Sequence, residues 1–259
     1  MLKKLIKYDI FWINRTIVIY FAITIILSAL VRIAENFTGS AIGDLIYGIL
    51  RGCTISAFVS VIVNASIRIW ERFRQNHYKD ESYLTHTLPV TKSELYDSKA
   101  LSALVSILLS LAVLIACFFL AFWNNDLSEY FRHLADSGDA TFLLIGIFIT
   151  AILEVIYIIN VGFFSIVLGH RSNSGRVARS AIIGMVLYFA LQTVLLIFIY
   201  GAGFFDDGIK AMFSNSPETA LSFESYRTLI IIADSLYLVL NFVLYFAAKA
   251  LFKKGVNVD

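Results

Sequence analysis

The sequence has few charged residues, few prolines and few cysteines. Only 15% of its 259 residues are Asp, Glu, Lys or Arg, whereas 59% are hydrophobic, and the mean hydropathy is +0.78. A soluble domain carries roughly 25% charged residues, so this chain cannot cover itself with a polar surface. The two prolines favour packed helices over a loop-rich fold. The two cysteines, Cys53 and Cys117, lie in apolar runs, where we expect buried free thiols; they exclude a disulfide framework.

Sequence motifs for catalysis are also missing. The chain has no G-x-x-x-x-G-K-[ST], the loop that holds nucleotide phosphates. No serine or cysteine lies in a nucleophile-elbow pattern, and the four histidines lack the spacing of metal ligands. We therefore expect no catalytic residues, no cofactor and no metal in this chain, and no nucleic acid as a partner.

Six apolar runs are each near the roughly 20 residues that cross about 30 Å of hydrocarbon. Lipid offers no hydrogen-bond partners to an open backbone, and no barrel-like alternation is present, so each run is predicted to be helical. The expected fold is an all-α polytopic membrane protein, with residues 1–259 forming a single transmembrane domain. The predicted spans are Thr16–Val31, Leu45–Ile69, Ala100–Trp123, Thr141–Leu168, Val177–Tyr200 and Thr228–Ala250.

Basic residues are unevenly divided between the two ends of these spans. Sixteen of the 21 Lys and Arg residues lie in the N-terminus, the second–third and fourth–fifth connections, and the C-terminal tail. Basic loops stay in the cytoplasm, so both termini are predicted to be cytoplasmic, in a protein of the cell membrane. The other side carries the remaining five basic residues, which are Arg32, Arg51, Arg132, Lys210 and Arg227.

Two segments next to the spans have a mixed character. Residues 1–15 interleave lysines with apolar residues and Trp12, a pattern typical of a helix in the headgroup region; a simple extension of the first span is the alternative. Residues 201–227 mix apolar and polar residues. They predict one or two short helices that enter the outer leaflet, or else a helix that lies on its surface.

The second–third connection, residues 68–99, shows more internal structure. Arg68–Lys79 continues the second span as a basic helix. A short helical segment is then expected over Glu81–Leu88 and should end before Pro89, because a proline disfavours the helical conformation of the residue before it. Thr91 and Glu94 have the spacing of a capping box, so a new helix is expected to begin near Lys92 and to continue into the third span. An ordinary solvated loop is the alternative.

This connection resembles that of the permease subunits of type-2 ABC exporters. In that family a short acidic lead, a Tyr-Leu pair, a Thr-Leu-Pro-Val core and a downstream Lys occupy the same connection. Here they are matched by Asp80–Leu84, Thr87–Val90 and Lys99. The six spans, the basic N-terminus and the broken apolar stretch before the last span match as well.

The resemblance implies that this connection is a coupling helix that sits in a cleft of a separate nucleotide-binding subunit. That partner would bind ATP and Mg, and a second permease copy or paralogue would complete the pathway in the lipid bilayer. By position, the coupling contact would involve Glu81, Ser82, Tyr83, Leu84, Thr87, Leu88 and Pro89.

Three charged residues lie more than three residues from either end of a predicted span, and a charge at mid-bilayer costs about 3 kcal/mol. Arg51 and Asp234 each lie six residues into a span, roughly 9 Å deep, and this similar depth predicts an ion pair between them. Glu154 has no basic partner at its depth. It is either a pathway residue or a structural carboxylic acid bonded to a neighbouring helix. Gly48 and Gly52 have the GxxxG spacing that allows close helix packing, within the chain or at a dimer seam.

The predicted function is therefore that of a permease in an ATP-driven exporter of an amphipathic substrate, such as a peptide, an antimicrobial or a lipid-like molecule. One alternative is a proton-coupled secondary transporter that uses Glu154 and Asp234. A second alternative is a membrane sensor or immunity protein that transports nothing.

Overall fold

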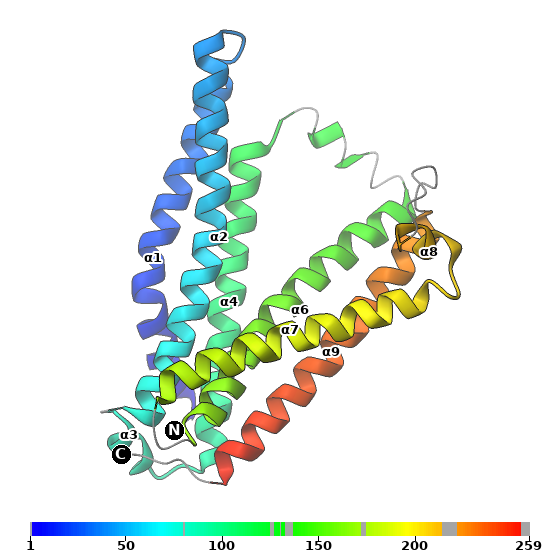
Figure 1. Ribbon diagram of the computed structural model, residues 1–259. Coiled ribbons are helices and arrows are strands. Elements are labelled where there is room, and N and C mark those ends of the chain that lie inside the picture. The colour runs from blue at the N-terminus through cyan, green and yellow to red at the C-terminus, as the bar shows by residue number, and fades with distance from the viewer. Residues whose placement is uncertain are drawn as a thin grey trace. The chain divides into compact units, whose positions relative to one another are not determined.

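A computed structural model describes most of the chain, and the part it describes contains helices and no strands (Figure 1). The helices are α1 (Leu2–Glu35), α2 (Ala41–Tyr78), α3 (Ser82–His86), α4 (Lys92–Phe122), α6 (Gly138–Gly169), α7 (Arg176–Ala202), α8 (Asp207–Phe213) and α9 (Phe223–Lys253). The described residues are 2–79, 81–124, 127–129, 131–132, 137–171, 175–213 and 222–254.

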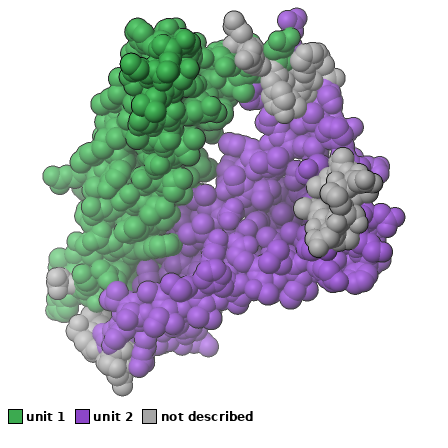
Figure 2. All heavy atoms as spheres, turned by 45° about the horizontal axis from the view of Figure 1, so that its top comes forward, with its two compact units in different colours: residues 1–130, 258–259 green, residues 131–257 purple. Residues whose placement is uncertain are grey.

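Six of these helices are long and apolar enough to cross a membrane: α1, α2, α4, α6, α7 and α9. Each contains one predicted span, except that Trp123 of the third span lies one residue beyond the end of α4. This arrangement supports a multi-pass membrane protein. The chain divides into two compact units (Figure 2). Unit 1 comprises residues 1–130 with 258–259, and unit 2 comprises residues 131–257.

In unit 1, α1 packs against both α2 and α4 (Figure 1). It is one continuous helix of 34 residues, so residues 2–15 extend the first span and form no separate helix. This is the alternative arrangement considered for the N-terminus. The extension is supported by burial, because Asp9 and Ile13, which precede the predicted span, are buried at the same four-residue spacing as Ile17 and Phe21 within it.

The contact surface of α4 is rich in small residues. Ser98, Ser102, Ser106 and Ser110 recur every four residues and are almost completely buried. Ser106 also accepts a hydrogen bond from the Asn14 side chain of α1 at 3.2 Å. Small residues let helices approach closely where the hydrophobic effect cannot drive association. Gly48 and Gly52 lie exposed, and a Cβ on either would meet nothing, so helix packing within unit 1 does not depend on them.

In unit 2, α6 packs against α7 and α9. The core contains Tyr157 and Val161 of α6 with Tyr237 and Leu244 of α9. Gly169 allows a close approach of α6 and α7, because a Cβ there would lie 2.7 Å from the backbone nitrogen of Ser180. A larger residue at 169 would push the two helices apart.

The segment between α7 and α9 contains the short helix α8. Asp206 begins it: its Oδ1 accepts hydrogen bonds from the backbone of Gly208 and Ile209 and from the Ser225 hydroxyl at 2.8 Å. Asp206 therefore joins the start of α8 to the start of α9. The structure agrees with the prediction of a short helix in residues 201–227, of which 214–221 lie outside the described residues.

One expectation about the cysteines is wrong. Cys117 is buried in unit 1, but Cys53 is exposed. Both lie in apolar runs, and the difference is one of helix face. In a membrane helix an apolar run can face lipid as well as the protein core, so burial does not follow from hydropathy.

Candidate functional site

The short helix α3 lies in the connection between α2 and α4. Glu81 precedes its first residue, and the Thr85 hydroxyl donates to the Glu81 carbonyl at 2.9 Å. The helix ends at His86, with Thr87 as its last flanking residue, so it stops short of the predicted Leu88. Leu88 is half-buried and Pro89 is exposed, while Asp80 lies outside the described residues. The expected helical segment is therefore present but shorter than predicted.

The two sides of α3 differ in exposure. Ser82 and Thr85 are buried, whereas Tyr83 is 77% exposed and Leu84 is 69% exposed. The Leu84 carbonyl is bonded by the Thr87 hydroxyl at 2.9 Å, which closes the last turn. The helix thus turns its small polar residues inward and presents two large apolar side chains outward.

The start of α4 has the predicted capping box. The Thr91 side chain accepts from the Glu94 backbone N–H, and the Glu94 carboxylate accepts from the Thr91 N–H at 2.9 Å. These reciprocal bonds satisfy two free donors of the helix end and set where α4 begins. The position at which α4 begins is therefore determined by the local sequence.

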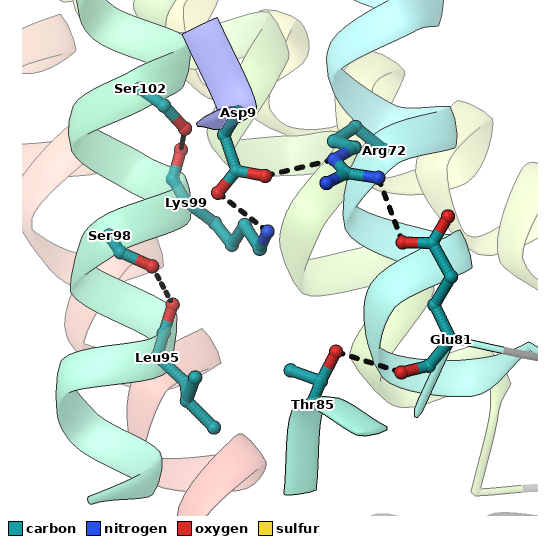
Figure 3. A network of polar contacts seen from close by, with 8 residues as sticks. All are labelled: Asp9, Arg72, Glu81, Thr85, Leu95, Ser98, Lys99 and Ser102. Carbon is teal, nitrogen blue, oxygen red and sulfur yellow. Dashed lines mark hydrogen bonds and ion pairs between the residues drawn. The ribbon is translucent and has the colours of Figure 1, made fainter. Parts of the chain in front are cut away.

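A group of charged side chains, which we call the anchor network, joins α1, α2 and α4 beside α3 (Figure 3). At its centre is Asp9 of α1, which is 1% exposed. Its Oδ2 lies 2.6 Å from Lys99 Nζ of α4, and its Oδ1 lies 2.9 Å from Arg72 Nε of α2. One carboxylate therefore serves two cations from two other helices.

Arg72 extends the anchor network to α3. Its second nitrogen lies 2.8 Å from the Glu81 carboxylate, at the N-terminal end of that helix (Figure 3). Its guanidinium also lies 5.0 Å from the centre of the Trp12 ring, in cation–π contact. Arginine suits this position because its planar fork can bond two carboxylates and stack on a ring at once.

The charges in the anchor network balance, with the carboxylates of Asp9 and Glu81 against Arg72 and Lys99. Balance matters because a buried charge without a partner costs several kcal/mol. The pairs differ in exposure: Asp9 and Lys99 are almost completely buried, whereas the Glu81 side chain is 47% exposed. The network thus has a buried core and a more accessible arm that ends on α3.

Sequence reasoning identified Glu81 and Lys99 but missed Asp9 and Arg72. A signal for Asp9 was available, since it is the first acidic residue of a strongly basic segment and none follows before Glu35. An isolated acid amid lysines and apolar residues indicates a specific partner. The identity of the partners could not be derived, because they lie 63 and 90 residues away.

The intramembrane candidates Asp234 and Glu154 both belong to unit 2. Asp234 of α9 accepts a hydrogen bond from the Thr150 hydroxyl of α6 at 2.6 Å. Glu154 is half-buried on α6. Further along the same interface, Asn160 donates to Asn241 at 2.7 Å. Asp234 is thus part of the contact between α6 and α9, and the role of Glu154 stays a prediction.

Arg51, the third intramembrane candidate, belongs to unit 1. Its guanidinium lies 5.5 Å from the centre of the Phe122 ring. The predicted ion pair between Arg51 and Asp234 would join the two units, and it stays a prediction.

Comparison of the chain with protein-family models, with curated proteins and with solved structures gives no match. Among the described residues, no group of three or more His, Cys, Asp or Glu side chains could hold a metal ion. The site combines the exposed pair Tyr83 and Leu84 of α3 with ion pairs that join Glu81 to α2 and, through Asp9, reach α1 and α4.

Proposed function

We propose that this chain is the membrane-spanning permease subunit of a type-2 ABC exporter, with α3 as the contact for a separate ATP-hydrolysing subunit. The observation that carries the proposal is the position of Tyr83 and Leu84, exposed on a helix whose N-terminal end is tied to the anchor network. Tyrosine is one of the residues that most often dominate the binding energy of a protein interface, and burial of the neighbouring Leu84 would add apolar area. The motif resemblance of residues 80–99 supports the same assignment.

The anchor network provides a route by which a displacement of α3 could move the membrane-spanning helices. Displacing Glu81 would pull on Arg72 of α2. Arg72 shares Asp9 with Lys99, so α1 and α4 would follow. ATP binding and hydrolysis with Mg in the partner subunit would thereby tilt three helices together. A second permease copy or paralogue would face this one across a pathway for an amphipathic substrate, such as a peptide, an antimicrobial or a lipid-like molecule.

The sidedness of the proposal follows from the basic residues. Lys3, Lys4 and Lys7 of α1 lie on the same side of the predicted spans as the connection that holds α3. Basic segments next to a span favour the cytoplasm, where ATP is available. A cysteine placed at the exposed residue 92 should therefore be labelled by membrane-impermeant reagents only in opened vesicles; labelling in intact cells would overturn this orientation.

The experiment that tests the function replaces the exposed pair, Tyr83→Ala with Leu84→Ala. The wild-type chain should co-purify with a P-loop ATPase whose turnover depends on it. The variant should lose at least tenfold in that stimulation while inserting at the same level, because an interface hot spot costs about 2 kcal/mol or more. A matched control is Ile42→Ala with Leu45→Ala, which removes two exposed apolar side chains at the other end of α2 and should leave stimulation intact.

The same assay separates the competing functions. If the exposed pair can be removed without loss of ATPase stimulation, α3 is not the coupling contact. If no ATPase co-purifies and a pH gradient alone drives flux, the protein is a secondary transporter, and Asp234→Asn should abolish that flux. If there is neither flux nor ATPase, a binding or immunity role is favoured.

A further inference from the structure

Unit 1 contains a pocket at the end opposite α3. Its volume is about 550 Å³, and four aromatic rings line it together with two charged residues. The rings are those of Tyr47, Phe58, Phe118 and Phe122, and the charged residues are Arg51 and Glu35. Arg51 lies 27 residues before the last residue of α2, which places it about 40 Å along the helix from the connection that holds α3.

The two charges that line the pocket are not equivalent. Glu35 forms an ion pair with Arg32 at 2.8 Å, and Arg32 also donates to the Trp123 carbonyl at the end of α4. Glu35 is therefore neutralised within its own helix. Arg51 contacts the Phe122 ring, and no carboxylate that the structure describes in unit 1 forms an ion pair with it. Among the described residues of unit 1, Arg32, Glu35 and Arg51 together thus carry one positive charge in excess.

The position of Arg51 suits a molecule that is charged at one end. The next charged residue on α2 is Arg68, about 25 Å further along the helix, so Arg51 marks one edge of an uncharged stretch. A guanidinium pairs well with phosphate oxygens because its parallel N–H groups match their geometry. The aromatic walls around it favour contact with a hydrocarbon chain.

We infer that this pocket binds an anionic amphiphile, in which a phosphate group pairs with Arg51 and an apolar chain lies against the aromatic walls. Such a molecule could be a phospholipid of the bilayer or an exported lipid-like cargo, since both carry the same chemistry. Binding itself is independent of the proposed function, whereas identifying the bound molecule as cargo rests on it.

The test measures binding of phosphatidylglycerol and phosphatidylcholine to the full chain in neutral detergent micelles, by native mass spectrometry. Wild type should prefer phosphatidylglycerol. Arg51→Gln should weaken phosphatidylglycerol binding about tenfold or more, because a hydrogen bond to a charged group is lost. It should weaken phosphatidylcholine binding less, because the choline cation of that lipid offsets the charge of its phosphate. Inorganic phosphate at the same concentration should not compete, because it lacks the apolar chain. Equal binding of both lipids, or an unchanged Arg51→Gln variant, would overturn the proposal.

A second variant should act in the opposite direction. Glu35→Gln releases Arg32 from its ion pair, adds positive charge to the pocket and should strengthen phosphatidylglycerol binding. General damage to the fold cannot strengthen lipid binding. The Glu35→Gln variant therefore tests the charge dependence of the pocket even if Arg51→Gln fails to insert. A loss of binding in Glu35→Gln would contradict the charge argument.

Two controls distinguish lipid binding at this pocket from the predicted Arg51–Asp234 ion pair and from the proposed coupling contact on α3. Asp234→Asn should leave lipid binding unchanged; a change equal to that of Arg51→Gln would favour the Arg51–Asp234 pair and overturn the pocket. Tyr83→Ala with Leu84→Ala should abolish ATPase stimulation but not lipid binding, so the two proposals fail separately. Release of bound phosphatidylglycerol when ATP is added to the chain together with its co-purified ATPase would identify cargo, and its retention would identify a resident lipid; both outcomes support the site.

Discussion

The two units of this protein hold their helices together with different polar groups. In unit 1, the charged side chains of Asp9, Arg72 and Lys99 meet at one end of the helices. In unit 2, amides and hydroxyls dominate within the helices, as in the bond between Asn160 and Asn241. Asp234 is the charged exception, and its described partner is a neutral threonine.

The difference follows from where each set lies along its span. Charges at the end of a span can be partly hydrated while they assemble, and several can gather if their sum is zero. Deep within a span, a charge costs about 3 kcal/mol, whereas a neutral amide costs less and can still bond across helices. The comparison indicates that unit 1 is tied tightly at one end, and that unit 2 is held by weaker bonds along its length.

Asp9→Asn should have the largest effect on stability. Asparagine keeps the shape but leaves Lys99 and Arg72 without their shared buried counter-ion. Removing one partner of a buried ion pair costs about 3–5 kcal/mol, and reversible unfolding in mixed micelles would measure the loss. Adding Lys99→Met to this variant should recover part of it, because the stranded charge is then gone. A variant as stable as wild type would show that the buried core of the anchor network does not stabilise unit 1.

Asn241→Leu should have an intermediate effect in unit 2. Asn241 accepts from Asn160 at 2.7 Å and donates to the carbonyls of Leu153 and Tyr237. Interhelical hydrogen bonds in membranes contribute about 0.6 kcal/mol on average and up to about 1.7, so we expect a loss of about 1–2 kcal/mol in the same unfolding assay. Asn160→Leu added to it should cost little more, since the bond is already absent. A loss of stability as large as that of Asp9→Asn would contradict the conclusion that unit 2 is held by weaker bonds than unit 1.

Glu81→Gln should have a small effect on stability and a large one on coupling. The Arg72–Glu81 pair is partly exposed, and such pairs contribute about 0.2–1 kcal/mol. Under the proposed function, the variant nevertheless loosens α3 and should lower ATPase stimulation severalfold. Glu94→Gln is the matched control, because glutamine can still complete the capping box at Thr91. Equal ATPase stimulation by Glu81→Gln and Glu94→Gln would show that the anchor network takes no part in coupling.

Asp206 should produce the smallest effect, which is present near neutrality and disappears in acid. Hydrogen bonds from the Ser225 hydroxyl, and then from the Ile209 and Gly208 backbone, hold the pKa of this carboxyl below its ordinary value of 3.8. A depressed pKa stabilises the folded state above the unfolded value and loses that contribution as the pH falls through the folded one. The stability difference between wild type and Asp206→Asn should therefore be constant near neutrality and shrink below about pH 3.8. A difference that is flat across this range would contradict the assigned bonds.

Structural features that depend only on short stretches of sequence could be predicted. The capping box at Thr91 and Glu94 and the continuation of the second helix beyond Arg68, which ends at Tyr78 and not at the predicted Lys79, depend on neighbours within about four residues. The short helix also ends before Pro89 as predicted, although at His86 and not at Leu88. The six apolar helices follow from composition alone, because lipid forces an apolar run into a helix. The prediction that Cys53 is buried was wrong because hydropathy identifies a span but not which face of it packs against protein.

The sequence by itself determined six apolar helices, a short helix after the second one and a capped restart, because backbone hydrogen bonding in lipid and local capping need no distant partner. Only the tertiary structure decided that Asp9 bridges Arg72 and Lys99, that α4 packs through its serines, and that Arg51 lines an aromatic pocket. These contacts join residues far apart in the chain, and many pairings are compatible with the same apolar pattern. Side-chain packing and charge balance select among them once the helices have come together.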